Sequence, residues 1–173
     1  WHAVDSWATT FRAPQISTGI ELGYIAPGSS KTVDLSKLGG RIMSVKVTVK
    51  SSALATQISS VTIQISEYAT GDAGGLPSKA HPYRWFDIVL DGIESEAVDS
   101  LEFTFRVEKV WLSWRGIDQN DVSIFSFSDG WKEYRANLID EDSNYWYYSC
   151  SSGVSSSYLI AGVKVEIIEA PTI

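Results

Sequence analysis

The stretch from residue 101 to residue 134 constrains the fold more than any other, because its pattern of apolar residues changes from strand to helix and back. Every second residue in 101–107 is apolar, which is typical of a strand with one buried face. Apolar residues then fall at helical spacing in 109–115, and Gly116 stands where a glycine often follows a helix. The segment 122–127 again has the composition of a strand. The stretch therefore predicts a strand, one helical turn, a second strand and, after a tight turn at 128–130, a third strand.

The remaining chain continues this β pattern. The clearest alternation runs through 42–50, where Val45, Val47 and Val49 are predicted to face the core while lysine and threonine face solvent. We expect the other strands at 19–25, 31–35, 61–66, 85–90, 131–138, 145–148, 158–161 and 163–168. About nine or ten strands with one helical turn predict an all-β sandwich of the immunoglobulin-like or jelly-roll kind. We expect residues 68–83, rich in Gly and Pro, to form a long loop, either a solvated connection or a contact surface.

The first 18 residues are predicted to form an extended arm ahead of a single domain at 19–173. Their apolar side chains alternate without helical periodicity, and Pro14 interrupts any ladder of hydrogen bonds. The arm has three interpretations: the first strand of the domain, an arm that packs into a neighbouring subunit, or a tag or linker remnant. Under the second interpretation, the candidate subunit contacts are Trp1, Val4, Trp7, Phe11 and Ile16.

Charge and hydropathy disfavour binding to nucleic acid or anionic lipid and insertion into a membrane. The chain has 21 acidic and 14 basic residues and a net charge of −7, which disfavours nucleic acid and anionic lipid because both require a basic surface. No apolar run approaches the roughly 20 residues of a membrane span, so we expect no membrane insertion. The sequence starts with Trp1, so it is either an expressed fragment or a mature chain whose signal peptide has been removed. We favour the second interpretation and expect an extracellular location.

The residues that carry catalysis are scarce. Cys150 is the only cysteine and is predicted to be a half-buried structural thiol, and His2 and His81 lie outside any catalytic motif. We therefore expect no enzyme. A glycosidase would need a pair of carboxylates, and the pattern marks none of the candidates as more than a solvated charge. These candidates are Asp87, Asp91, Glu102 and Glu108.

Two binding sites remain open at this point. The acidic turn formed by Asp140, Glu141, Asp142 and Asn144 is the best metal candidate, although it lacks the spacing of a calcium-binding hand. We expect a solvated hairpin turn and no cofactor, with weak calcium binding as the alternative. Exposed aromatic residues would suit a carbohydrate platform, for which the candidates are Trp111, Trp114, Trp131 and Trp146.

The opening stretch resembles the archaeal cell-surface domain called PGF-pre-PGF. That family has a strand ending in a Val-x-Lys-x-Trp-Leu element, an Ile-Asp turn, a strand, a Gly-Trp pair and an aromatic strand. The matching residues are Val107, Lys109, Trp111, Leu112, Ile117, Asp118, Val122, Gly130, Trp131 and 145–148. The resemblance spans roughly residues 30–162. The sequence differs from the family pattern at 152–155, where it has Ser-Gly-Val-Ser and the family has a Pro-Gly-Phe-Ser element.

The resemblance implies an extracellular archaeal β-sandwich of surface-layer and surface-associated proteins, without catalytic residues to carry over. It also implies packing roles for Val107, Lys109, Trp111, Leu112, Gly130 and Trp131. Because we expect no anchor after Ile173, polymerisation would keep such a domain at the surface. We therefore predict a structural subunit that assembles into a homopolymer through its N-terminal strand. The alternative is a surface-associated module that binds a glycan or another protein.

Overall fold

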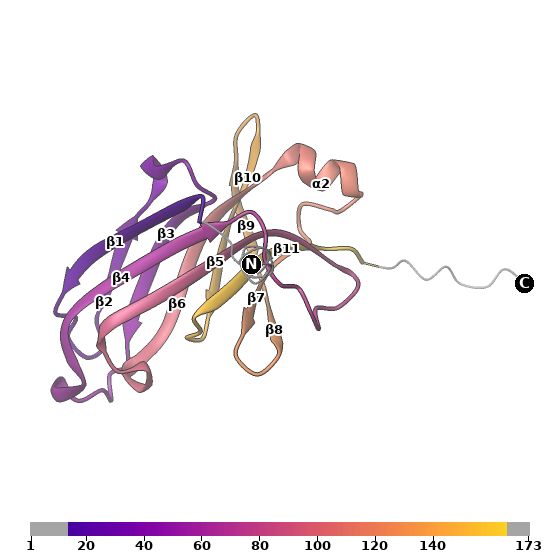
Figure 1. The fold of residues 1–173 in the computed structure, drawn as a ribbon. Helices are drawn as coiled ribbons and strands as arrows, with labels where there is room; N and C mark the ends of the chain where they lie inside the picture. Colours follow the sequence, from indigo (N-terminus) through magenta and orange to yellow (C-terminus); the bar gives the residue numbers. More distant parts are fainter. Residues whose placement is uncertain (1–13, 166–173) are drawn as a thin grey trace, which may run out of the picture.

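The computed structural model describes residues 14–165 and places them in two antiparallel β-sheets that pack face to face, with one short α-helix (Figure 1). Sheet A has six strands in the order β1-β4-β5-β11-β7-β8, and sheet B has five in the order β2-β3-β6-β10-β9. The prediction of an all-β sandwich is confirmed.

Strands of both sheets alternate along the chain. Sheet A contains β1 (Ile16–Gly23), β4 (Ile58–Tyr68), β5 (Ala80–Ile93), β7 (Val122–Phe127), β8 (Trp131–Arg135) and β11 (Ser157–Val163). Sheet B contains β2 (Ser30–Asp34), β3 (Ile42–Val49), β6 (Val98–Glu108), β9 (Asn137–Glu141) and β10 (Tyr145–Ser152). The helical elements are η1 (Ser36–Leu38), η2 (Ala55–Gln57), η3 (Ser95–Ala97) and α2 (Lys109–Arg115).

The core lies between the sheets and is built from the alternating faces of β3, β4 and β6, as their sequences predict. Aromatic side chains join the two layers at its centre. Phe86 of β5 stacks on Tyr158 of β11 with ring centroids 5.0 Å apart, and Phe103 of β6 meets Tyr158 edge-on at 5.1 Å. Because the three rings come from three strands and both sheets, they hold the two layers in register.

A second, smaller apolar cluster covers the outer face of sheet A. Phe125 and Leu159 are buried there, with Leu76, Trp85 and Trp131 packed over them. Leu76 belongs to the irregular connection between β4 and β5, so this loop packs against the sheet. The packing explains why β11 is buried on both faces, a pattern that alternation alone does not predict for an antiparallel sheet.

The predicted helical turn is confirmed with its bounds as α2. Leu112 is 2% exposed and anchors the helix to the core, and Gly116 ends it in the left-handed region at φ 65°. The N–H of Gly116 donates to the carbonyl of Ser113, and that of Ile117 donates to the carbonyl of Leu112, which closes the last turn. Val107, just before the helix, is 1% exposed in the core.

Three local expectations differ from the structure. The predicted strand 131–138 is two strands, β8 in sheet A and β9 in sheet B, because the chain crosses between the sheets at Ala136. Ile42 is buried although Ser44 of the same parity faces outward, because a register shift between these two residues changes the face. The expected strand 163–168 is not continued in the described residues, where β11 ends at Val163.

The sandwich has two ends that differ in their contents. At the α2 end, β1 begins opposite Glu67, and β6 leads into the helix. At the other end, here called the η3 end, β5 and β6 are joined through η3. In Figure 1, α2 lies at the right of the molecule and the β5–β6 connection at the left.

Candidate assembly site

A network of polar and aromatic side chains closes the α2 end. Arg41 Nη2 lies 2.5 Å from Glu108 Oε1, and Arg41 Nε donates to the hydroxyl of Tyr83 at 2.8 Å. The Tyr83 hydroxyl in turn donates to Glu108 Oε1 at 2.9 Å. The Trp111 ring meets the Tyr83 ring edge-on with centroids 4.7 Å apart. The network therefore joins the start of β3, the start of β5, the end of β6 and α2.

The environment of the network sets its protonation states. Burial raises the pKa of Tyr83 to about 12, so its hydroxyl keeps its proton and remains a donor. Burial opposes ionisation of Glu108, but hydrogen bonds from Arg41 and Tyr83 outweigh it and hold the pKa of this carboxyl below 4.5. Burial also opposes the charged form of Arg41, yet its hydrogen bonds with Glu108 and Tyr83 raise its pKa overall. The arrangement is a satisfied ion pair, which is a structural role and gives no sign of a catalytic acid.

Sequence reasoning missed a buried carboxylate beside this network. Glu67 of β4 is 5% exposed, and it accepts the backbone N–H of Arg41 at 2.8 Å and that of Ile42 at 3.1 Å. The alternation along β4 could have predicted its burial, because Glu67 lies on the same face of the strand as the buried Ile63 and Ile65. Glu67 thus fixes the start of β3 against sheet A, close to the point where β1 begins.

The acidic turn that sequence analysis singled out is the hairpin between β9 and β10. Asp142 Oδ1 accepts the N–H groups of Asn144 and Tyr145, and Asp142 Oδ2 accepts the Tyr147 hydroxyl at 2.6 Å. The Tyr147 hydroxyl first, and then these two N–H groups, lower the pKa of Asp142.

The other acids of this hairpin also have partners within the chain. Glu141 pairs with Lys109 at 2.5 Å, and Asp140 accepts the N–H of Glu141. These oxygens close the hairpin, and residues 14–165 contain no group of three or more His, Cys, Asp or Glu residues that is arranged to hold a metal ion. Calcium binding stays a prediction without further support.

The candidate nucleophile and base lie far apart in the fold. Cys150 is buried in β10, where burial raises the pKa of its thiol to about 11 and its Sγ donates to the carbonyl of Tyr134 at 3.4 Å. His81 lies in β5, in the other sheet. Among the glycosidase candidates, Glu108 belongs to the network, and Glu102 accepts a long hydrogen bond from Ser151. Within residues 14–165, Cys150 and His81 lie in different sheets and do not form a nucleophile–base pair.

Three of the four candidate platform tryptophans are held by their own chain. Trp111 carries the Arg115 guanidinium over its ring at 4.4 Å, and Trp146 carries the Lys109 ammonium at 4.3 Å. The indole N–H of Trp131 donates to a loop carbonyl at 3.0 Å.

Trp131 and Trp111, which the resemblance groups as packing residues, pack in different places. Trp131 packs against the outer cluster, and Trp111 packs against the main core. The neighbouring Gly130 adopts φ 103° in the hairpin between β7 and β8. Trp114 is the exception among the four, with 85% of its surface exposed.

Most residues predicted to contact a neighbouring subunit lie outside the described part of the chain: Trp1, Val4, Trp7 and Phe11. Ile16 lies inside it. It begins β1 and pairs with Glu67 of its own sheet, so the structure uses it within the sandwich. The boundary between arm and domain therefore falls before Ile16 rather than after residue 18.

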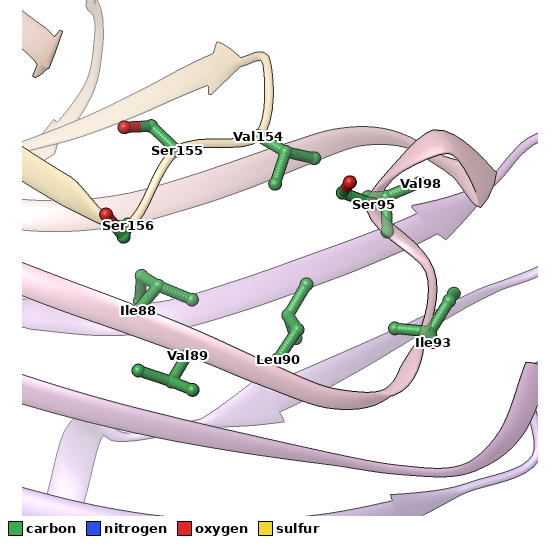
Figure 2. A pocket seen from close by; sticks show the side chains of 9 residues that line it. All are labelled: Ile88, Val89, Leu90, Ile93, Ser95, Val98, Val154, Ser155 and Ser156. Carbon is green, nitrogen blue, oxygen red and sulfur yellow. The ribbon is translucent and has the colours of Figure 1, made fainter. Parts of the chain in front are cut away.

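An apolar groove near the η3 end lies between β5, the η3 connection to β6 and the β10–β11 connection. Its volume is about 280 Å³, and it is lined by Ile88, Val89, Leu90, Ile93, Ser95, Val98, Val154, Ser155 and Ser156. Figure 2 shows Ile88 and Leu90 of β5 pointing towards Val154 in the β10–β11 connection. A cavity of about 150 Å³ holds one benzene ring, so this groove has room for one or two apolar side chains.

The groove follows an unpaired edge of β5. The pairing of β11 with β5 ends at Asp87, and the N–H of Ile88 donates to the carbonyl of Ser156 at 3.0 Å. In the described chain, β5 continues from Val89 to Ile93 with β4 as its only partner. Because hydrogen-bonding directions alternate along a strand, Leu90 turns its N–H and C=O groups to the same side as Ile88. Within the described residues, this side of β5 therefore has no paired strand beyond Ile88.

Three of the four outermost strands of the two sheets, β8, β9 and β2, are protected in ways that this edge is not. β8 carries Lys132 and Glu133, and β9 is short and has a register shift against β10. β2 is also short and carries Lys31 and Asp34. The open half of β5 lies beside an apolar groove, which is the arrangement that admits an added strand.

Comparison of the sequence with models of protein families and with curated proteins gives no match. The similarity to the PGF-pre-PGF domain therefore stays a prediction. Within residues 14–165, none of the helical elements has the length and apolar character needed to cross a membrane.

Proposed function

We propose that this chain is the structural subunit of an extracellular filament or cell-surface assembly that polymerises by strand donation. One observation carries the proposal: the open half of β5, with an apolar groove of about 280 Å³ beside it. An archaeal cell surface is the setting that the sequence resemblance supports. In the proposed assembly, residues 1–13 of one copy pair with Val89–Ile93 of the next copy as an added strand of sheet A.

The sequence of residues 1–13 suits this groove. Trp7 and Phe11 share one face of an extended strand, so both side chains would point into the acceptor. Thirteen extended residues span about 43 Å, which is long enough to cross between two copies and fill the edge. The groove has room for one or two large side chains, which Trp7 and Phe11 would supply.

The direction of β1 favours donation to another copy over insertion into the same chain. β1 starts at Ile16 opposite Glu67, at the α2 end, and runs towards the η3 end, where it reaches Gly23 opposite Val61. The residues before Ile16 therefore join the fold at the end away from the groove. A donor at one end and an acceptor at the other give head-to-tail contacts, which build open filaments.

A pair of added cysteines distinguishes donation to another copy from insertion into the same chain. The chain has one cysteine, Cys150, which is buried, so we expect disulfide bonds to form between the added cysteines alone. We expect the double variant Thr9→Cys with Ser156→Cys, in the full chain, to give a ladder of covalent multimers on a non-reducing gel. A monomer that runs faster only without reductant would show insertion into the same chain and would contradict donation.

Groove and arm variants test the assembly itself. Val154→Asp places a charge in the groove at a residue that is already 39% exposed, and Val165→Asp is its control at 57% exposure. We expect Val154→Asp, like the arm variant Trp7→Ser with Phe11→Ser, to leave folded monomers without filaments in electron micrographs. Val165→Asp should assemble as the unchanged chain does. Normal filaments from both the groove and the arm variants would overturn the proposal.

The alternative is a surface module that binds a glycan or another protein. It is favoured by Trp114, whose ring is 85% exposed. The other candidate tryptophans are partly buried, so they do not extend that surface into a platform. A glycan array that detects the isolated monomer, and loses the signal for Trp114→Ala, would support this alternative.

A further inference from the structure

The outer face of α2 presents two apolar side chains to solvent. Trp114 is 85% exposed and Val110 is 56% exposed. They are four residues apart in a helix, so they lie next to one another on the same face. Tryptophan is the residue that most often anchors protein contacts, since it buries a large area with few rotatable bonds.

The helix presents this face in a fixed orientation. Leu112 is buried on its inner face, Gly116 ends it with a closed turn, and Lys109 pairs with Glu141 of the β9–β10 hairpin. Ser113 and Arg115 complete the exposed surface, and the helix contains no acidic residue. Trp114 therefore stands on a rigid, cationic projection at the end where the arm joins the fold.

The η3 end has the complementary character. Leu54 is 64% exposed, and its N–H donates to Gln57, whose amide donates to Glu94 at 3.2 Å. The η3 turn itself carries Glu96, and Asp91 and Asp99 flank it in the chain; all three are exposed. An apolar side chain linked through Gln57 to a carboxylate matches an aromatic side chain beside an arginine.

We propose that the α2 face docks on the η3 end of the next copy, with Trp114 against Leu54 and Arg115 facing Glu94 and Glu96. The inference rests on the proposed function, because strand donation from the α2 end to the η3 end brings these two surfaces to the same junction. The occupant is a second copy of this chain. The contact would fix the angle between successive subunits, which a donated strand alone leaves free to swivel.

The test measures the critical concentration for assembly of the full chain by sedimentation and light scattering. We expect Trp114→Ala to raise it roughly tenfold or more, the loss typical of a central aromatic contact, while filaments still form at high concentration. Ile139→Ala, which removes a 55% exposed side chain elsewhere, should stay within about twofold. Arg115→Glu should weaken assembly, and adding Glu96→Lys to the same chain should restore it.

The outcomes separate this inference from the one on which it depends. Unchanged assembly of Trp114→Ala, or failure of Glu96→Lys to rescue Arg115→Glu, overturns the α2 contact even if the arm variants abolish filaments. Filaments absent from the unchanged chain overturn strand donation and this contact together. Glycan binding by the monomer that depends on Trp114, with unchanged assembly, also overturns it.

Discussion

The two ends of the sandwich are finished differently. At the α2 end, the Tyr83 hydroxyl, Arg41 and Glu108 saturate one another, and Trp111 covers Tyr83. At the η3 end, β5 runs beyond its partner β11 and leaves a strand edge beside an apolar groove. A chain that folded only for itself would gain by closing both ends, since unpaired backbone groups and unfilled apolar space are costly. This difference is the basis of the proposal that the η3 end accepts a strand from another copy.

The largest effect is expected at the η3 end, from a change in the backbone of the open strand. Gly92 has φ 81°, and a Cβ there would lie 2.0 Å from the carbonyl oxygen of Ser60. We expect Gly92→Ala to lower the free energy of unfolding by about 3 kcal/mol, because backbone must move as well as adopt a strained angle.

Gly39 supplies the control for that change. It has φ 77°, but a Cβ there would meet nothing within 4 Å. Gly39→Ala should cost only about 1 kcal/mol, the cost of the left-handed angle alone. Urea unfolding measures the loss of unfolding free energy for both variants. Equal losses would show that the backbone of β5 moves at Gly92 without cost and would contradict the prediction.

A smaller effect is expected from the closed end. Tyr83→Phe removes the hydroxyl that joins Arg41 to Glu108 and leaves the ring contact with Trp111 in place. The expected loss of unfolding free energy is about 1 kcal/mol, the worth of a partly buried hydrogen bond. Tyr24→Phe, at a half-exposed tyrosine near the η3 end, should change it by less than about 0.5 kcal/mol. A loss at Tyr24 as large as that at Tyr83 would contradict the distinction between the ends.

The smallest effect is a pH dependence confined to the α2 end. The pKa of Glu108 is lower in the folded chain than its ordinary value of 4.5, so its contribution to stability is complete above that value. The contribution is lost as the pH falls through the lowered pKa. We expect the thermal midpoint of Glu108→Gln to fall less steeply between pH 5 and pH 3 than that of the unchanged chain. Parallel curves would show that this ion pair has no part in acid sensitivity.

The sequence predicts the regular parts of the fold well, because their signals are local. The alternation through β3, β4 and β6 identifies the core face, and Gly116 marks the end of α2. The predictions that are wrong concern features that depend on contacts between residues far apart in the sequence. The crossing at Ala136 divides one apparent strand between two sheets, and nothing in its neighbours marks a turn.

The candidate site was predicted only on its donor side. Alternating apolar residues predict an extended segment at residues 1–18, for which a subunit contact is one interpretation, whereas the proposed acceptor is a groove between β5 and a loop some sixty residues later in the chain. Such a gap depends on where the pairing of β11 stops, which is a property of the whole sheet. Glu67 is similar, since its parity marks it as buried but its donors come from the start of β3.

The pairing of β1 with β4 has a mechanical consequence. In a filament of the proposed kind, a pull on the arm acts along the length of β1, and its paired residues from Ile16 to Gly23 share the load in shear. Peeling, in which the pairs would break one after another, is avoided. The load passes from β1 through β4 to β5, which also receives the strand of the next copy. Sheet A would then carry the tension of the fibre.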